Sequence, residues 1–161
     1  MGRSRGGLTS KIHLVTDGQG RPLSVVLTGG NINDTTMMIE TLERIRVPRS
    51  GGGRPRTRPE RVVADKGYPS RANRAYLARR SIKATIPDRD DQTRNRANKG
   101  SAGGRPPAFD AETYKRRNVV ERGINRLKNW RGIAMRSDKT ARNYQAGITL
   151  AATLIWLNPT T

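Results

Sequence analysis

The stretch Tyr114-Lys-Arg-Arg117-Asn-Val-Val-Glu121-Arg-Gly-Ile-Asn-Arg-Leu-Lys128 has the periodicity of an amphipathic helix. At ~100° per residue, four polar residues of this run fall within an arc of about 60°. These residues, called the stripe below, are Tyr114, Arg117, Glu121 and Lys128. A neighbouring face is apolar and carries Val120, Ile124 and Leu127. The spacing predicts a helix from Ala111 to about Trp130.

The stripe combines one carboxylate with two cations and a phenol. A carboxylate can bind a divalent metal ion, and cations with a phenol can bind a phosphate backbone. This combination suits an enzyme that cuts or joins nucleic acid. A charged helix face is more often only solvated, with Glu–Lys and Glu–Arg pairs worth about 0.3 kcal/mol each. The stripe alone therefore leaves both interpretations open.

The composition indicates a polyanion-binding protein. The 161 residues suffice for one domain, and 33% hydrophobic and 4% aromatic residues predict a modest core. Lysine and arginine number 32 against 13 acids, a net charge of +19. So basic a chain is expected to bind nucleic acid, with an affinity that falls steeply with salt. Membrane-surface binding is the weaker alternative, because no long amphipathic Lys/Leu helix is evident.

Cysteine usage and apolar runs exclude several classes. The chain has no cysteine, so disulfides and cysteine–zinc sites are excluded, and a reducing compartment fits. No apolar run follows Met1, so no signal peptide is expected. The longest apolar stretch, Ala146–Leu157, is too short to span a bilayer and is expected to form a buried helix.

Local patterns predict alternating strands and helices. Residues 1–10 are expected to be a basic, flexible arm, and residues 11–161 the folded domain. Strands are predicted at Lys11–Thr16, Pro22–Thr28, Arg61–Ala64 and Ile82–Pro87, and helices from Asp34 to Ile45, from Pro69 to Arg80 and from Thr140 to Leu157. Asp17–Arg21 is expected to be a hairpin turn, Pro48–Pro59 a solvated linker and Asp88–Pro107 a polar, structureless stretch. This order predicts an α/β fold with a mixed sheet covered by helices.

A second isolated carboxylate, Asp65, follows the apolar run Arg61–Ala64. Ligand sites in open α/β sheets collect beyond the carboxyl ends of strands, and Gly67 allows a close backbone approach there. The alternative is an aspartate that caps the following turn. If folding brings Asp65 and Glu121 together, their oxygens can ligate magnesium.

Several motifs resemble those of DDE transposases of bacterial insertion sequences, of the IS4/IS5-like type. Tyr114-x2-Arg117-x3-Glu121-x6-Lys128 is similar to the Tyr-Arg-Glu-Lys signature of that family. Ala64-Asp65-Lys66-Gly67-Tyr68 looks like the segment that carries its second catalytic aspartate. Further similar segments are Arg3–His13, Thr28–Asp34 and Asn129–Gly132, so the resemblance covers nearly the whole chain.

The resemblance implies an RNase H-like fold that cuts the ends of a mobile element and joins them to target DNA. Asp65 and Glu121 would then be catalytic and metal-binding carboxylates for Mg²⁺ or Mn²⁺. Arg117 and Lys128 would bind phosphates near the element end, with Tyr114 in support. The basic stretch 88–107 would lie against DNA. The implied partners are double-stranded DNA and further copies of the chain, with no membrane, in the cytoplasm at the nucleoid.

One departure from the family concerns its first catalytic aspartate, which precedes the segment matched by Arg3–His13. Asp17 is the only acid near the first predicted strand, and its Asp-Gly context favours a hairpin role. The expectation is a carboxyl-terminal portion whose first strand is missing, impaired alone and partnered by an upstream-frame transposase segment. A non-catalytic basic nucleic-acid-binding protein and an RNase H-like nuclease remain alternatives. The charge fits all three, whereas the Tyr-Arg-Glu-Lys pattern favours the transposase.

Three other residues are expected to be structural. His13 is the only histidine, and a single histidine on a strand is more often structural than a ligand or base. Trp130 and Trp156 are expected to be core or half-buried anchors, and base stacking by Trp130 is the weaker alternative.

Overall fold

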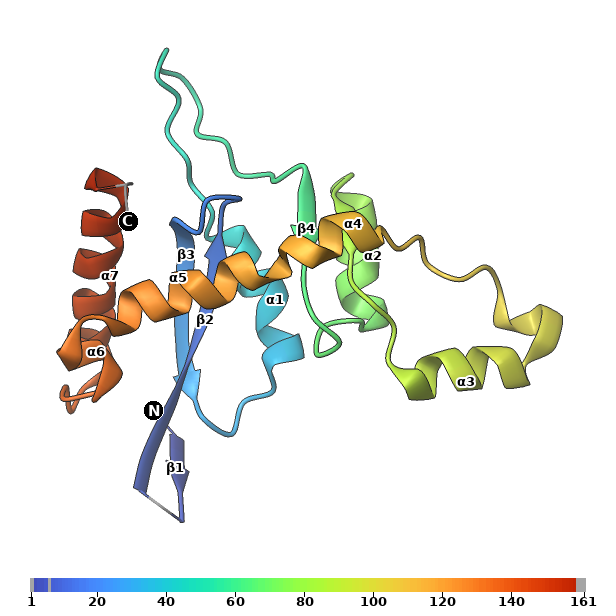
Figure 1. Ribbon diagram of the computed structural model, residues 1–161, viewed down its shortest axis with the longest axis horizontal. Coiled ribbons are helices and arrows are strands. Elements are labelled where there is room, and N and C mark those ends of the chain that lie inside the picture. The colour runs from blue at the N-terminus through green and yellow to red at the C-terminus, as the bar shows by residue number, and fades with distance from the viewer. Residues whose placement is uncertain (1, 6, 159–161) are drawn as a thin grey trace. The chain divides into compact units, whose positions relative to one another are not determined.

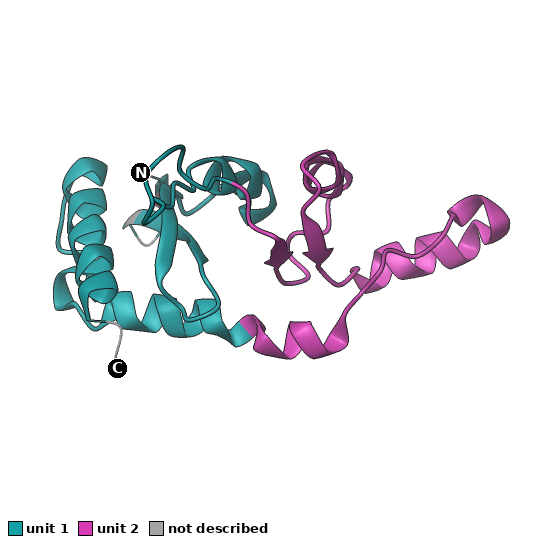
Figure 2. Cartoon of the chain, turned by 90° about the horizontal axis from the view of Figure 1, so that it is seen from above, with its two compact units in different colours: residues 1–57, 118–161 teal, residues 58–117 magenta. Residues whose placement is uncertain are grey.

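Two units, each with its own small sheet, make up the chain in the computed structural model, which describes residues 2–5 and 7–158 (Figure 1). Unit 1 comprises Met1–Thr57 and Asn118–Thr161, and unit 2 comprises Arg58–Arg117 (Figure 2). The architecture is mixed α/β, as the sequence predicts. The strands of the described residues do not form one mixed sheet, because the antiparallel strands pair in unit 1 and the parallel strands pair in unit 2.

An antiparallel sheet of order β1-β2-β3 organises unit 1. The strands are β1 (Gly2–Ser4), β2 (Gly7–Thr16) and β3 (Pro22–Gly29). The predicted hairpin between β2 and β3 is confirmed, and the backbone N–H of Asp17 donates to Arg21 O over 3.0 Å. Residues 2–4 and 7–10 of the predicted arm are extended and paired. This pairing uses backbone groups, so the glycine-rich sequence shows no side-chain pattern that would predict a strand here.

Helices cover both faces of this sheet (Figure 1). On one face, helix α1 (Asp34–Glu43) packs on β3, where the buried Ser24 hydroxyl donates to Thr41 O over 2.7 Å. The N-cap of α1 is Asn33, whose side chain accepts from the N–H of Thr35, so Asp34 is the first residue of the helix and not its cap. Asp34 instead pairs with Lys11 at 3.2 Å.

The main core of unit 1 lies on the other face. It is built by helices α5 (Val119–Lys128), α6 (Arg131–Ala134) and α7 (Ala141–Leu157) against Ile12, Leu14, Val25 and Leu27 of the sheet. Its buried members are Leu127, Ile133, Tyr144, Ile148, Ala151 and Ile155. Burial raises the pKa of the Tyr144 phenol, which donates to Ile133 O over 2.9 Å. The predicted helix is thus confirmed as α7, but only one of its faces is buried, since Leu150 and Leu157 are exposed.

Unit 2 is built on a parallel strand pair joined by a helix. Strand β4 (Arg61–Val63) pairs with β5 (Lys83–Thr85), and α2 (Arg71–Arg79) connects them. The Ser70 side chain caps α2 by accepting from the N–H of Asn73. Tyr76, Leu77, Ile82 and Ile86 are buried. The predicted strand–helix–strand order is confirmed.

The prediction that Asp88–Pro107 is structureless is wrong. Its residues form helix α3 (Asp90–Asn98) followed by the 3₁₀ helix η1 (Gly100–Gly103). Asp90 and Asp91 in the first turn complement the helix dipole. Ion pairs then fix the segment in place of apolar burial, and for that reason hydrophobic periodicity does not reveal it.

Candidate functional site

The run that carries the stripe is helical but not one continuous α-helix. It consists of α4 (Ala111–Tyr114), the 3₁₀ helix η2 (Lys115–Asn118) and α5. The predicted single helix is therefore wrong at its centre, where no glycine or proline marks the change. The boundary between the units falls between Arg117 and Asn118. The stripe accordingly consists of two pairs, Tyr114 with Arg117 in unit 2 and Glu121 with Lys128 in unit 1.

Tyr114 and Arg117 lie next to each other in unit 2. Side chains three apart nearly eclipse in a 3₁₀ turn, and the Arg117 guanidinium carbon lies 6.0 Å from the Tyr114 ring centroid. Phe109 packs against the same ring, with centroids 5.2 Å apart and ring planes tilted by 57°. Upstream, Asp110 caps α4 by accepting from the backbone N–H of Thr113 over 2.9 Å. This hydrogen bond, more than the nearby Arg61 guanidinium, lowers the pKa of the Asp110 carboxyl.

Glu121 and Lys128 share one exposed face of α5. Their seven-residue spacing returns to within about 20° on an α-helix. The opposite face is pressed onto the hairpin, because a Cβ on the buried Gly123 would lie 2.8 Å from Thr16 Cγ2 and 3.2 Å from Gly20 O. Close helix–hairpin contact thus fixes the direction in which Glu121 and Lys128 point.

Asn125 belongs to the same exposed face and is absent from the sequence prediction. It follows Glu121 by four residues and precedes Lys128 by three. The helical arithmetic that found the stripe also finds Asn125, and an amide adds a donor and an acceptor to this polar face.

Asp65 is exposed in the turn directly after β4. Its Oδ1 accepts from the N–H of Gly67 over 2.8 Å, and its carbonyl accepts from the N–H of Tyr68 over 3.2 Å. A Cβ on Gly67 would lie 2.8 Å from Asp65 Oδ1, so glycine makes this approach possible. The turn-capping alternative is confirmed. It leaves Oδ2 of Asp65 with no hydrogen bond or ion pair to any described residue.

Asp17 serves the β2–β3 hairpin, as predicted. Its Oδ1 accepts from the N–H groups of Gln19 and Arg21, each over 2.9 Å. Its Oδ2 accepts from the Arg21 guanidinium over 2.6 Å. Both carboxylate oxygens of Asp17 are therefore engaged in the turn.

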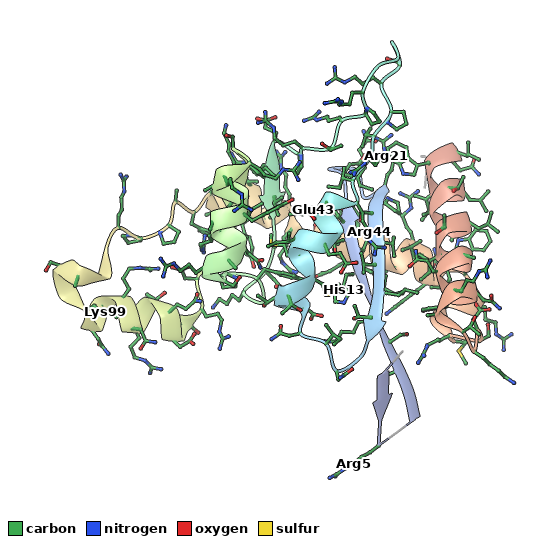
Figure 3. The ribbon with its side chains drawn as sticks, turned by 180° about the vertical axis from the view of Figure 1, so that it is seen from behind. Arg5, His13, Arg21, Glu43, Arg44 and Lys99 are labelled. Carbon is green, nitrogen blue, oxygen red and sulfur yellow. The ribbon has the colours of Figure 1, made fainter. Side chains whose placement is uncertain are left out.

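His13, labelled in Figure 3, is also structural, as predicted. Its side chain is buried, and its Nε2 lies 2.7 Å from Thr28 Oγ1. Burial lowers the pKa of the imidazole, and Asp34, whose Oδ1 lies 3.8 Å from Nδ1, partly opposes this effect.

Neither tryptophan belongs to the core, but Trp156, 38% exposed, is anchored by contacts of its side chain. Trp156 donates from Nε1 to Pro22 O over 2.6 Å, and the Arg21 guanidinium carbon lies 4.2 Å from its ring centroid. Trp130 is 44% exposed and lines a groove of about 600 Å³ between α5 and the end of α7.

The predicted convergence of Asp65 and Glu121 stays a prediction, because the two carboxylates belong to different units. Within residues 2–5 and 7–158, no group of three or more histidine, aspartate or glutamate side chains is arranged to hold a metal ion. No helix among these residues is long and apolar enough to cross a membrane.

A family model described as "Transposase DDE domain" matches residues 2–156, and the chain belongs to this family. The chain is 36% identical over 156 residues to the transposase named for insertion sequence element IS402 of Burkholderia cepacia. That match covers 97% of this chain and 65% of the relative. The chain is 31% identical over 150 residues to the transposase named for IS6501 of Brucella ovis, and this match covers 93% of the chain and 99% of the relative. No solved structure matches the chain.

Proposed function

We propose that the chain acts in DNA transposition by binding the DNA ends of an insertion sequence and contributing two carboxylates to metal-dependent strand cleavage and transfer. The observation that carries the proposal is the exposed Glu121–Lys128 face of α5, held by close packing of Gly123 on the hairpin. In this proposal Asp65 and Glu121 are the metal-binding carboxylates, and Tyr114, Arg117 and Lys128 bind DNA phosphates.

The Asp65 turn fits a divalent cation ligand. One oxygen is fixed by the Gly67 N–H, and the other is open and exposed. Hard cations such as Mg²⁺ and Mn²⁺ take carboxylate oxygens of this kind. When bound, such an ion makes an attacking oxygen more nucleophilic and stabilises a leaving oxygen at phosphorus.

The side chains themselves have distinct roles. Lys128 and Arg117 neutralise phosphate charge and hold the strand in register, and the guanidinium can do so with two parallel hydrogen bonds. Tyr114 lies against Arg117 and restricts its orientation. Glu121, one turn from Asn125 and two turns from Lys128, presents a carboxylate beside the phosphate that Lys128 binds.

The third carboxylate, and the strand that carries it, are proposed to come from a segment outside residues 1–161. Asp17 does not fit this role, because both of its oxygens are engaged in the hairpin. The sheet edges support the proposal. β1 pairs with β2 only at residues 7–9, which leaves the Lys11–Thr16 edge unpaired by the described strands, and β4 pairs only with β5. A first RNase H-like strand would pair with such edges.

The test is a cleavage and strand-transfer assay on DNA that carries both borders of the encoding insertion sequence, with Mg²⁺ or Mn²⁺. Residues 1–161 alone are expected to bind these ends and to leave them uncut. Addition of the upstream segment with its aspartate, fused or in trans, is expected to restore cleavage, which Asp65→Asn or Glu121→Gln then abolishes.

A parallel Mn²⁺ titration, followed by electron paramagnetic resonance, measures metal binding independently of DNA cleavage. Glu43→Gln, an exposed carboxylate of α1, is the matched control and is expected to change nothing. Efficient cleavage by residues 1–161 alone that Asp17→Asn removes would refute the assignment of the third carboxylate. Cleavage that survives both Asp65→Asn and Glu121→Gln would refute the metal site.

A further inference from the structure

Helix α3 buries none of its residues, although it belongs to a folded unit. A surface helix normally buries an apolar stripe, and a helix that is polar all round needs another reason to form. Its nine residues, Asp-Asp-Gln-Thr-Arg-Asn-Arg-Ala-Asn, include only one apolar side chain, Ala97. The helix is therefore held by polar contacts and presents polar groups outward.

Asp88 is the centre of these contacts. Its side chain is only 14% exposed, and it accepts from Arg74 of α2 over 2.7 Å and from Arg96 of α3 over 2.8 Å. Each arginine takes a different carboxylate oxygen. Gln92 adds a hydrogen bond of 3.1 Å to Pro69 O. These contacts fix α3 on the rest of unit 2.

The 3₁₀ helix η1 then folds back closely on α3. A Cβ on Gly103 would lie 2.3 Å from Arg96 O, so only glycine allows this approach. Gly100, directly after the C-cap Lys99, has φ +54°, which ends the helix in the left-handed conformation. The carboxyl-terminal end of α3 is thus defined.

The outer face of α3 carries two amides and two cations. It consists of the exposed Arg94, Asn95, Asn98 and Lys99, which span an arc of about 140°. None of these side chains forms a hydrogen bond or ion pair with another described residue. The acids of this segment are paired instead, Asp88 as above, Asp90 with Lys66 and Asp91 with Arg89. The outer face therefore carries positive charge that no acid of this segment pairs with, and its Lys99 is labelled in Figure 3.

We propose that α3 is a recognition helix that enters the major groove of double-stranded DNA. An α-helix with its side chains is about 10–12 Å across, and the major groove, about 12 Å wide, admits it. The nine residues of α3, at about 1.5 Å each, would extend about 13 Å along the groove. Arginine pairs with guanine and asparagine with adenine through two hydrogen bonds. Arg94, Asn95 and Asn98 read base edges, and Lys99 binds phosphate. An RNA duplex does not fit, because its major groove is too narrow for side chains to read.

This inference rests on the proposed function for its ligand, DNA, and adds sequence recognition by a specific helix. It also makes Asp88 a positioning residue. Loss of an acid from a protein of net charge +19 should strengthen DNA binding by charge alone. Loss of Asp88 instead releases α3 from Arg74 and removes sequence discrimination.

The experiment exposes residues 1–161 to a pool of randomised DNA duplexes, sequences the retained fraction, and measures affinity for a selected and a scrambled duplex at several salt concentrations. The parent is expected to enrich a short motif and to prefer it at least tenfold. Asn95→Ala combined with Asn98→Ala is expected to lose about tenfold or more on the selected duplex and nothing on the scrambled one. Lys99→Ala is expected to lower the salt slope by about 0.9 on both.

Asp88→Asn is expected to lose the preference, and Glu43→Gln, which removes the same charge, to keep it. A parent that enriches no motif, or a double asparagine variant that keeps the preference, overturns the recognition helix. Binding to all duplexes without preference refutes this inference and leaves the proposed function standing. Failure to bind any duplex refutes both. The parent and the double asparagine variant are expected to bind an RNA duplex of the selected sequence with equal affinity. A difference in affinity between them would also contradict major-groove reading.

Discussion

The contact between α5 and the β2–β3 hairpin can be tested by adding one methyl group. Gly123→Ala places a Cβ 2.8 Å from Thr16 Cγ2 and 3.2 Å from Gly20 O, so the helix or the hairpin must move. Overpacking of this kind costs about 1–3 kcal/mol, and the higher helix propensity of alanine returns about 1 kcal/mol. The net expectation is a loss of about 0–2 kcal/mol in the free energy of unfolding.

Gly147→Ala is the matched control. Gly147 lies inside α7, and the nearest atom to its added Cβ is Asp138 Oδ2 at 4.0 Å. With no contact to offset it, helix propensity should stabilise this variant by about 0.5–1 kcal/mol. The two variants should therefore differ by about 0.5–3 kcal/mol, with Gly147→Ala the more stable, although the chemical change is the same.

Urea denaturation followed by tryptophan fluorescence suits this comparison, because Trp130 and Trp156 are the only tryptophans and both lie in unit 1 with the two glycines. The urea midpoint should rise for Gly147→Ala and stay below that of Gly147→Ala for Gly123→Ala, at an unchanged m value. Equal midpoints for the two variants would refute the close contact and, with it, the reason given for the direction of Glu121 and Lys128.

Three further predictions concern unit 1 and DNA binding. The lowered pKa of His13 means that the unfolded chain binds the proton more readily than the folded chain does. Stability should therefore be full above the ordinary pKa of 6.5 and fall as the pH drops below it. Urea midpoints measured at about pH 7.5 and about pH 5.5 should show this fall in the parent and a smaller fall in His13→Asn. Asp17→Ala should lose about 1–3 kcal/mol of unfolding free energy, because four hydrogen-bonding contacts of the hairpin disappear, whereas Glu43→Ala should lose little. Lys128→Ala and Arg117→Ala should each lower the salt slope of DNA binding by about 0.9, and Arg54→Ala in the solvated linker should not; equal slopes for all three variants would reduce the stripe to a solvated face.

Elements with a strong local pattern could be predicted from the sequence. The Asp-Gly turn between two apolar runs identified the β2–β3 hairpin, and apolar periodicity identified α1, α2 and α7. Helix α3 could not be found in this way, because its anchor, Arg74, lies 14 residues before Asp88 and the helix has no apolar stripe. The 3₁₀ turn at Lys115–Asn118 was equally hidden, since it contains neither glycine nor proline.

In the candidate site, too, only relations within one element could be predicted from the sequence. Helical arithmetic placed Glu121 and Lys128 on one face, because both lie in α5. Gly67, two residues after Asp65, indicated the turn that the structure shows there. The spacing between Asp65 and Glu121 could not be predicted, because a repeat of 3.6 residues relates only positions within one element.

The ion pairs around Asp65 give a further reason to propose that it binds a metal ion. The chain has 32 lysines and arginines, so an exposed carboxylate has many possible partners. Lys66, its immediate neighbour, pairs with Asp90 at 3.0 Å, and Arg61 at the start of β4 pairs with Asp110 at 2.8 Å. Both cations flanking the turn are thus taken by other acids, and Asp65 keeps one oxygen open within the described residues. Because no lysine or arginine among the described residues pairs with this oxygen, it stays accessible to a divalent metal ion, which binds through open carboxylate oxygens.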